Sequence, residues 1–173
     1  MPILLRSTHP DATAALGRGL ARLLRPGDVV VLTGPLGAGK TRLVQGIAAG
    51  LDVPGRVTSP TFVLVRRHAG RLPLVHVDAY RLDHAADLVT LDDDVLADDV
   101  VTCIEWGGNV ADALPGDRID VELTVDGEDG DAPRMIGIAP NGATWEARTA
   151  ALDEVVAELL AATLALTHAE ASA

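Results

Sequence analysis

Lysine is almost absent from this chain, which has a single lysine, Lys40, among its 173 residues. The remaining residues among its 14 lysines and arginines are all arginine. Arginine can replace lysine on most protein surfaces, but its wide planar guanidinium does not fit where a compact ammonium must reach between phosphates inside a tight backbone loop. We therefore expect Lys40 to occupy a place where only lysine works.

Other scarce features narrow the class of protein. The chain has one cysteine, so it cannot form an internal disulfide, and we expect Cys103, inside the apolar run 100–104, to be a buried unreactive thiol. No stretch approaches the roughly 20 uninterrupted apolar residues that span a bilayer, and the N-terminus lacks a basic region followed by an apolar run. We expect a cytoplasmic protein that does not contact a membrane.

Aromatic residues and positive charge are also in short supply. Aromatic residues make up 2% of the chain, and the formal net charge is -11. Affinity for nucleic acid comes largely from neutralising phosphates with Lys and Arg, and single strands stack on aromatic side chains. The chain alone is therefore expected to bind RNA or DNA poorly. If its function concerns RNA, another protein supplies the basic surface.

Lys40 belongs to a complete phosphate-binding motif. Residues 34–41 read GPLGAGKT, which matches G-x-x-x-x-G-K-[ST] at every position. An apolar β-branched run precedes the motif at 28–33 and a helical pattern follows it at 43–49, so the motif lies between a strand and a helix. In such a loop backbone N–H groups face the phosphates, Lys40 approaches the β and γ oxygens, and the Thr41 hydroxyl is placed to ligate Mg²⁺. The predicted ligand is a nucleoside triphosphate with magnesium.

The remaining pattern predicts a single α/β domain. Two pairs of apolar runs have hairpin spacing, and an antiparallel pair beside the P-loop strand makes the sheet mixed rather than all parallel. We therefore predict one P-loop NTPase domain over residues 1–173, a three-layer sandwich with a mixed central sheet, whose tail at about 167–173 could be disordered. The elements predicted around the P-loop unit are an edge strand beginning at Leu4, a helix from a Thr8 cap to about Leu24, extended segments at 57–67 and 72–77, a helix after Tyr80, a strand at 100–104, a hairpin of 119–125 with 135–139, and a last helix from about Thr149.

Two apolar runs end in an acid that could serve the nucleotide. One run ends at Asp78 and the other at Glu105, and both would deliver a carboxylate to the carboxyl edge of the sheet, where ligands bind in folds of this class. Mg²⁺ prefers an octahedral shell of oxygens, and Thr41 with phosphates and waters leaves room for such an acid. The residues alone do not rank the two acids. One is expected to hold magnesium and its waters, and the other to orient or polarise the attacking water.

A Ser/Pro/Thr turn, VTSPTF at 57–62, follows the P-loop helix. Many P-loop hydrolases carry a segment here that senses the γ-phosphate, and the hydroxyls of Ser59 and Thr61 could do so. An ordinary turn into a strand is the alternative. Taken singly, His76 is expected to be a hydrogen-bonded core histidine and Trp106 a core residue.

In order along the chain, the segments G-x-L-G-A-G-K-T, S-P-T-F, H-V-D-A-Y-R-L and I-E-W resemble the TsaE family, the small ATPase subunit of bacterial threonylcarbamoyladenosine tRNA modification. The resemblance runs from about Ser7 to the C-terminus. It implies that Thr41 and Glu105 hold magnesium, that Asp78 is a Walker B-like acid, and that 59–61 form a switch-like segment. The expected catalytic residues are Lys40, Asp78 and Glu105, and the expected nucleotide-binding residues are Thr13, Gly37, Ala38, Gly39, Lys40, Thr41, Arg42, Ser59 and Thr61.

The family also implies cofactors and partners. Its members use ATP with Mg²⁺ and work with TsaD and TsaB, which transfer the threonylcarbamoyl group to the adenosine beside the anticodon in tRNAs reading A-starting codons. The tRNA contact is expected to belong mainly to these partners, in line with the acidic charge, and the chain alone is expected to be a monomer. The sequence departs from the family's usual residues at Pro35, at 66–68 and at 107–109.

Other functions also use a P-loop. A small-molecule kinase is the alternative reading, but such kinases usually add a mobile lid with several arginines, whereas Arg66, Arg67 and Arg71 fall in a hairpin. A nucleotide-dependent scaffold with vestigial hydrolysis would bind ATP without turnover. A GTPase is disfavoured, because the N-K-x-D motif that usually recognises guanine requires a second lysine.

Overall fold

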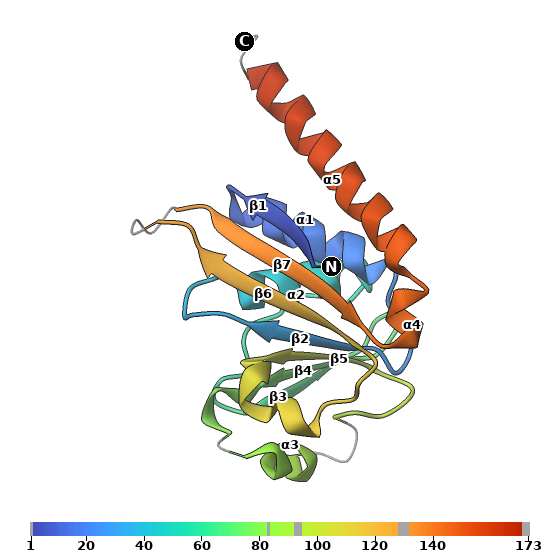
Figure 1. The fold of residues 1–173 in the computed structure, drawn as a ribbon. Helices are drawn as coiled ribbons and strands as arrows, with labels where there is room; N and C mark the ends of the chain where they lie inside the picture. Colours follow the sequence, from blue (N-terminus) through green and yellow to red (C-terminus); the bar gives the residue numbers. More distant parts are fainter. Residues whose placement is uncertain (1, 83, 92–94, 128–131, 171–173) are drawn as a thin grey trace.

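The structure is a computed structural model that describes residues 2–82, 84–91, 95–127 and 132–170. Within these residues the chain forms one seven-stranded sheet with helices on both faces (Figure 1). The predicted α/β class and the mixed sheet are confirmed. The tail at about 167–173 is the segment that, from its sequence, could be disordered. The last helix continues to Glu170, and residues 171–173 lie outside the described residues.

The sheet contains strands of both directions. The strands are β1 (Ile3–Ser7), β2 (Val29–Thr33), β3 (Val65–His68), β4 (Leu74–Asp78), β5 (Val101–Glu105), β6 (Arg118–Val125) and β7 (Arg134–Asn141). Their order is β1-β7-β6-β2-β5-β4-β3. The four central strands, β6, β2, β5 and β4, are parallel to one another, whereas the pairs β1–β7, β6–β7 and β3–β4 are antiparallel. Both predicted hairpins and the predicted N-terminal edge strand are therefore present.

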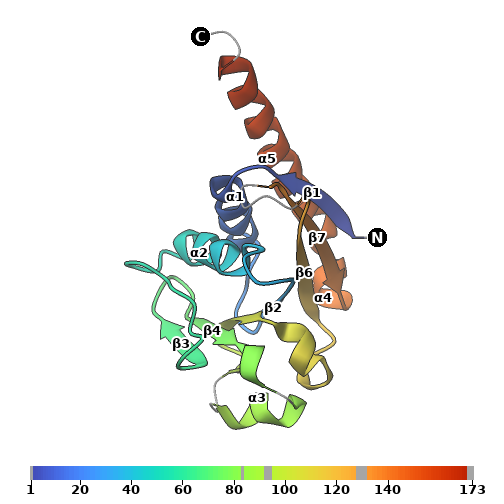
Figure 2. The ribbon, with the colours of Figure 1, turned by 90° about the vertical axis from the view of Figure 1, so that its left-hand side faces the viewer.

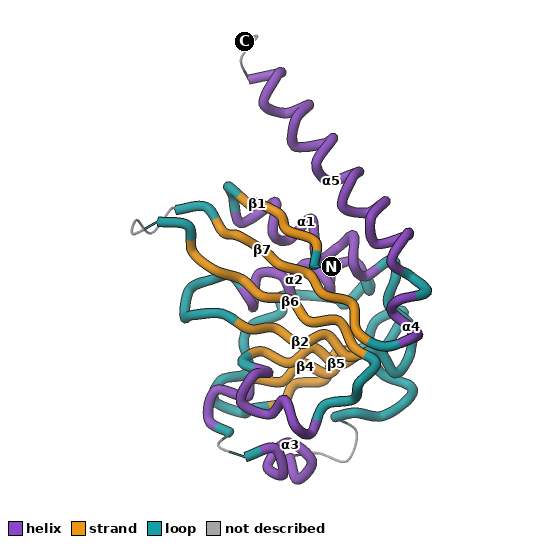
Figure 3. Tube along the Cα trace, in the orientation of Figure 1, coloured by secondary structure: helices purple, strands orange, loops and turns teal. Residues whose placement is uncertain are grey.

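Helices on the two faces complete the three predicted layers. One face carries α1 (Pro10–Ala21), α2 (Lys40–Gly50) and α5 (Thr149–Glu170), which follows the short α4 (Ala143–Glu146); the other carries η1 (Ala79–Arg81), α3 (Ala85–Leu91) and η2 (Gly107–Ala113). In Figure 2, α1 and α2 lie together on one side of the sheet, and Figure 3 shows α5 projecting beyond it. No helix in the described part of the chain is long and apolar enough to cross a membrane.

Alternate residues of the central strands enter two separate cores, because successive side chains of a strand point to opposite faces. In β2, Val30 and Leu32 lie in the core shared with α1 and α2, and Val29 and Val31 lie in the core shared with η1, α3 and η2. Cys103 is fully buried in the first core, and burial raises the pKa of its thiol. The single cysteine is a core residue, as predicted.

The start of α1 differs from the prediction. The cap is His9, not Thr8: the His9 Nδ1 accepts a hydrogen bond from the Asp11 N–H at 3.1 Å. Pro10 then takes the first helical position, where its fixed φ suits the helix and its missing N–H would have had no partner.

The same helix also ends earlier than predicted, at Ala21 rather than about Leu24. Proline disfavours the helical conformation of the residue before it, so the chain must leave the helix before Pro26. It then turns at Gly27, which has φ 84° and whose N–H donates to the Val100 carbonyl, before entering β2. The apolar periodicity continued past the residue at which the backbone has to turn.

Most of the segment predicted to be extended, 57–67, is a loop, and β3 begins only at Val65. The Pro60 carbonyl accepts hydrogen bonds from the N–H groups of Val63 and Leu64, and Leu64 has a left-handed φ of 65°. A turn closed in this way cannot pair in a ladder. The Leu64 carbonyl accepts from the Asp78 N–H, which fastens the loop to the end of β4.

Helices α1 and α2 touch at glycines. A Cβ atom on Gly17 would lie 2.3 Å from the Leu43 carbonyl oxygen, and one on Gly46 would lie 2.1 Å from that of Ala14. Neither space admits a methyl group, so any larger residue would push the two backbones apart. This close contact fixes the helix that follows the P-loop against the rest of the layer.

A buried ion pair joins the C-terminal helices to the turn before β2. Arg148 donates from its two terminal nitrogens to the two oxygens of Asp28, at 2.6 and 2.7 Å, and the side chains are 6% and 8% exposed. The Arg148 guanidinium also donates to the Leu23 carbonyl and lies 3.9 Å from the centroid of the Trp145 ring. The pair therefore holds α4 and α5 against the segment that leads into the P-loop strand.

Replacing Arg148 by methionine should strongly destabilise the fold. The buried Asp28 carboxylate would lose its partner, and breaking a buried pair typically costs about 3–5 kcal/mol. Urea unfolding followed by circular dichroism measures the free energy of unfolding. The pair Arg22–Glu158 is exposed and serves as the control, so Arg22→Met should leave this free energy unchanged within error. Equal losses in the two variants would contradict the assigned role.

Candidate nucleotide-binding site

The register between β4 and β5 brings the polar side chains of the sheet together at its carboxyl edge. Asp78 pairs with Glu105, and His76 pairs with Cys103, in this parallel ladder. Cys103 faces the core of α1 and α2, so by the alternation of strand side chains the other three project from that same face. His76, Asp78 and Glu105 are 0%, 2% and 3% exposed. The two acids singled out from the sequence are therefore buried neighbours.

The segment 34–41 connects β2 to α2 and has the geometry of a P-loop. Gly34, Gly37 and Gly39 have positive φ values of 132°, 78° and 105°. Such values are rare for residues with a Cβ, so the loop requires glycine there. Helix α2 begins at Lys40, whose ammonium lies within the loop and donates to the carbonyls of Gly34 and Pro35 at 2.7 and 2.9 Å. The first N–H groups of an α-helix have no partner within the helix and commonly bind anions such as phosphate.

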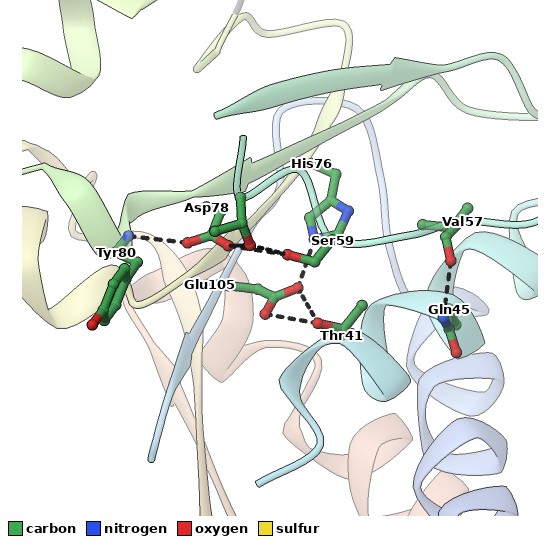
Figure 4. A network of polar contacts seen from close by, with 9 residues as sticks. Thr41, Gln45, Val57, Ser59, His76, Asp78, Tyr80 and Glu105 are labelled. Atoms are coloured by element: carbon green, nitrogen blue, oxygen red, sulfur yellow. Dashed lines mark hydrogen bonds and ion pairs between the residues drawn. The ribbon is translucent and has the colours of Figure 1, made fainter. Parts of the chain in front are cut away.

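The P-loop threonine contacts one of the two acids directly. Thr41 Oγ1 donates to Glu105 and lies 2.8 and 2.9 Å from its two carboxylate oxygens (Figure 4). His76 Nε2 lies 2.8 Å from Glu105 Oε1. A carboxylate only accepts, so Nε2 carries the proton and donates, while the buried Nδ1 has no hydrogen-bond partner within the described residues. His76 is thus a hydrogen-bonded core histidine, as predicted, and its partner is the acid that faces the P-loop.

The other acid, Asp78, binds the Ser/Pro/Thr turn. Its Oδ2 accepts from Thr61 Oγ1 at 2.5 Å and from Ser59 Oγ at 3.0 Å, and its Oδ1 accepts from the Tyr80 N–H at 3.0 Å. The two hydroxyl oxygens lie 2.7 Å apart. Figure 4 shows this cluster beside the carboxylate that faces the P-loop. The turn is therefore more than a connection into a strand, because the hydroxyls of Ser59 and Thr61 are bound to a site carboxylate.

Trp106 is partly buried against the core of η1, α3 and η2, in line with the prediction, and it also lies over the P-loop lysine. The Lys40 Nζ is 3.7 Å from the centroid of the Trp106 ring, and the Tyr80 ring lies 5.0 Å from the same ring. Trp106 follows β5 directly and has a left-handed φ of 60°. Burial lowers the pKa of Lys40, and the Glu105 carboxylate opposes that shift. A sequence pattern cannot signal this contact, because it depends on one residue's unusual backbone conformation.

A cavity of about 500 Å³ opens between the P-loop and the first helix. Residues 37–39 of the loop line it together with Thr13, which is 3% exposed and whose Oγ1 lies 2.8 Å from Ser7 Oγ. Arg134 at the start of β7 also lines it and donates to the Gly37 carbonyl at 3.2 Å. The sequence analysis missed Arg134, because 97 residues separate it from the glycine it contacts and no motif surrounds it.

Arg42 lines the same cavity but also has a structural role. It donates to the Pro10 carbonyl at 3.2 Å and forms an ion pair with Asp11, so it links α2 to the start of α1. Its guanidinium is thus positioned at the cavity by partners on a neighbouring helix.

The oxygens of Thr41 and Glu105 suit Mg²⁺. The described residues contain no group of three His, Cys, Asp or Glu side chains that could hold a metal ion, so a cation here would take most of its ligands from phosphates and water. Hydroxyl and carboxylate oxygens are ligands that Mg²⁺ prefers, so Thr41 and Glu105, whose oxygens lie 2.8 and 2.9 Å apart, would supply the protein's share of them.

This strand, loop and helix, with buried acids on the neighbouring parallel strands, define a P-loop NTPase domain. The crystal structure of Bacillus subtilis YdiB shares the fold, with a TM-score of 0.76 and 30% identity, and the match covers 89% of this chain and 95% of that one. The chain belongs to the TsaE family: the sequence profile described as "Threonylcarbamoyl adenosine biosynthesis protein TsaE" matches residues 7–135. Proteins of this family are involved in tRNA threonylcarbamoyladenosine biosynthesis.

Individual relatives confirm the family resemblance. The tRNA threonylcarbamoyladenosine biosynthesis protein TsaE of Streptomyces coelicolor is 47% identical over 137 residues, which cover 75% of this chain and 91% of that protein. The protein of the same name from Mycobacterium tuberculosis is 51% identical over 123 residues, 65% of this chain and 73% of that one. The one from Bacillus subtilis is 35% identical over 125 residues, 72% and 78% of the two chains.

Nucleotide binding should move the Trp106 ring away from Lys40, because phosphate oxygens compete for the ammonium more strongly than an aromatic face does. Intrinsic tryptophan fluorescence should therefore change as ADP is added, with the same midpoint as a calorimetric titration. In Trp106→Phe the fluorescence change should disappear, although the core residue Trp145 remains. An unchanged emission spectrum of the unmodified chain at saturating ADP would show that the ring stays in place.

Proposed function

We propose that this chain is a Mg²⁺-dependent ATPase that supports threonylcarbamoyladenosine modification of tRNAs reading A-starting codons, acting with TsaD and TsaB. The observation that carries the proposal is the chain of contacts from Thr41 to Glu105 to His76, beside Lys40 and next to Asp78. P-loop hydrolases use a lysine, a hydroxyl and acidic side chains for phosphate, metal and water, so this set of contacts supports the proposal. The family membership supplies the biological setting.

Binding of the phosphates rests on the loop and its lysine. Backbone N–H groups of the loop and of the first turn of α2 point toward the space that the phosphates would fill. Lys40 already lies within the loop, held by two carbonyls, and needs only to exchange them for phosphate oxygens. Thr13 and Arg134 line the adjoining cavity, which is large enough for a nucleoside.

Thr41 and Glu105 would hold the metal. The Thr41 hydroxyl donates a hydrogen bond to the carboxylate, so the lone pairs of its oxygen remain available to a cation. His76 donates to Glu105 through Nε2 and fixes the orientation of the carboxylate. Mg²⁺, when bound there, would neutralise charge on the β and γ phosphates.

Asp78 is the acid best placed to act on water. Ser59 and Thr61 donate to only one of its oxygens, Oδ2, and the other accepts from a single backbone N–H, so the carboxylate retains lone pairs that can accept from a water molecule. A γ-phosphate near these hydroxyls would change their hydrogen bonds and thereby the position of Asp78.

The division of labour with partners follows from charge. A chain with a net charge of -11 repels the phosphates of tRNA, so TsaD and TsaB would carry the main tRNA contact. We place the chain in the cytoplasm, where the modification would occur, and expect it to be a monomer when alone.

The kinase alternative finds no support in the arginines that could have formed a lid. Arg71 donates to the Gly50 and Ala21 carbonyls and closes the ends of α2 and α1, and Arg66 donates to Thr58. Both arginines lie in or beside the β3–β4 hairpin. Neither is carried by a long insertion that could close over a substrate.

Single substitutions should separate binding from hydrolysis. Lys40→Ala should abolish measurable nucleotide binding in calorimetry, because the ammonium is the loop's main charge toward the phosphates. Glu105→Ala and Asp78→Ala should bind nucleotide but hydrolyse it about 10²–10³-fold more slowly, as is typical when one preorganised group is lost. Glu122→Ala, an exposed acid on β6, is the control and should hydrolyse ATP normally. Normal turnover in both site-acid variants would refute the assignment.

The proposed function is tested by measuring ATP hydrolysis by the purified chain, alone and with TsaD and TsaB from the same source, beside multiple-turnover modification of tRNA. We expect weak hydrolysis by the chain alone, faster hydrolysis with the partners, and repeated modification only when hydrolysis occurs. ATP consumption only upon phosphorylation of a small metabolite would favour a kinase instead. ATP binding without turnover, even with the partners, would favour a scaffold.

A further inference from the structure

The few aromatic side chains of this chain gather at the nucleotide site. The sequence has one Phe, one Tyr and two Trp, and three of these four, Phe62, Tyr80 and Trp106, lie at the carboxyl edge of the sheet. Phe62 is 88% exposed and Tyr80 is 58% exposed. A chain this poor in aromatics therefore leaves two of them in water beside its site.

An exposed aliphatic side chain adjoins Phe62. Val63, the next residue along the chain, is 57% exposed. Exposed aromatic and aliphatic groups that lie together are typical of a binding surface, and aromatic residues are enriched among the few that dominate binding energy.

The backbone holds Phe62 outward. Val63 and Leu64 both donate their N–H groups to the Pro60 carbonyl, at 2.9 and 2.6 Å, which closes a turn around Phe62. Leu64 then fastens the turn to Asp78 through its carbonyl. A backbone fixed in this way loses little conformational freedom when a partner covers the side chain it carries.

The charge around Phe62 has the opposite sign to that of the whole chain. The stretch 53–73 contains four arginines and no Asp or Glu, whereas the complete chain has a net charge of -11. Arg66 in this stretch is exposed and holds the start of the loop through Thr58. Arg81, on η1, lies over the Phe62 ring with its guanidinium carbon 5.6 Å from the ring centroid. The apolar group is therefore bordered by cations.

The residues that carry or adjoin the exposed side chains hydrogen-bond to Asp78. Thr61, adjacent to Phe62 in sequence, donates to Asp78 at 2.5 Å, and the Tyr80 N–H donates to the other oxygen of the same carboxylate. Figure 4 shows Tyr80 on the opposite side of Asp78 from the P-loop threonine. A partner that binds Phe62 and Tyr80 would therefore act on the neighbouring groups that hydrogen-bond the two oxygens of Asp78.

We infer that Phe62, Val63 and Tyr80, with Arg66 and Arg81 around them, form a docking surface for a protein partner that presents an apolar pocket rimmed by carboxylates, and that docking positions Asp78 through Thr61. The inference rests on the proposed function, whose protein partners would provide that pocket. A protein fits better than RNA, because Val63 offers no stacking face and the net negative field of the chain repels phosphates.

The first test measures binding of each variant to the purified TsaD–TsaB complex by surface plasmon resonance. Phe62→Ala should raise the dissociation constant at least about ten-fold, as expected for an aromatic residue at the centre of an interface. Leu4→Ala is the matched control, since Leu4 is 69% exposed on β1, at the opposite edge of the sheet, and should bind as the unmodified chain does. Arg66→Glu should also weaken binding, and Arg6→Glu on β1 should not.

The second test examines the connection to Asp78. Phe62→Ala should hydrolyse ATP at the unmodified rate when alone but lose its stimulation by the partners. Thr61→Val should keep its affinity for the partners and yet lose the ratio of stimulated to basal rate, because the hydrogen bond that transmits docking is gone. Melting temperatures of the variants confirm that each is folded.

The outcomes distinguish the inference from the proposed function. If the unmodified chain binds TsaD–TsaB and Phe62→Ala binds equally well, the docking surface is wrong and the proposed function stands. If the unmodified chain does not bind the complex at all, both are wrong. If the isolated chain binds tRNA and Phe62→Ala abolishes that binding, the surface recognises RNA and the inference is overturned.

Discussion

The parallel pairing of β4 with β5 is the constraint on which the site depends. It places Asp78 directly opposite Glu105, and the alternation of strand side chains turns both carboxylates and His76 toward the helix of the P-loop. A shift of one residue in this register would turn one acid into the opposite core. The contacts of Thr41, the Ser/Pro/Thr turn and His76 all follow from this one alignment.

The charged groups of the site all have partners within the protein. Lys40 has two carbonyls and an aromatic face, Glu105 has Thr41 and His76, and Asp78 has two hydroxyls and an N–H. Buried charges without such partners would be strongly unfavourable, so these contacts stabilise the site. In the proposed function, binding of a nucleotide and its metal would exchange these internal partners for phosphate and metal.

The two acids face different parts of the protein, and this separates their roles. Glu105 is bound by His76 and by Thr41 of the P-loop, which connects two central elements of the fold. Asp78 is held by a loop whose next residue, Phe62, is in solvent. In the proposed function Glu105 would hold the metal and Asp78 would act on water, and an acid next to an exposed loop is suited to control by a partner.

The sequence by itself determined the P-loop, the α/β class, the mixed sheet and the two candidate acids, because these depend on local spacing: glycines with a single lysine, and apolar runs that end in a carboxylate. It did not reveal the ends of α1, the loop before β3 or the contact of Trp106 with Lys40. These features depend on the backbone conformations of single residues, namely His9, Leu64 and Trp106. The distribution of partners, with Glu105 on Thr41 and Asp78 on Thr61, was decided by tertiary structure alone. Strand register and helix packing bring together residues that are far apart in the chain, and no local pattern encodes the distance between them.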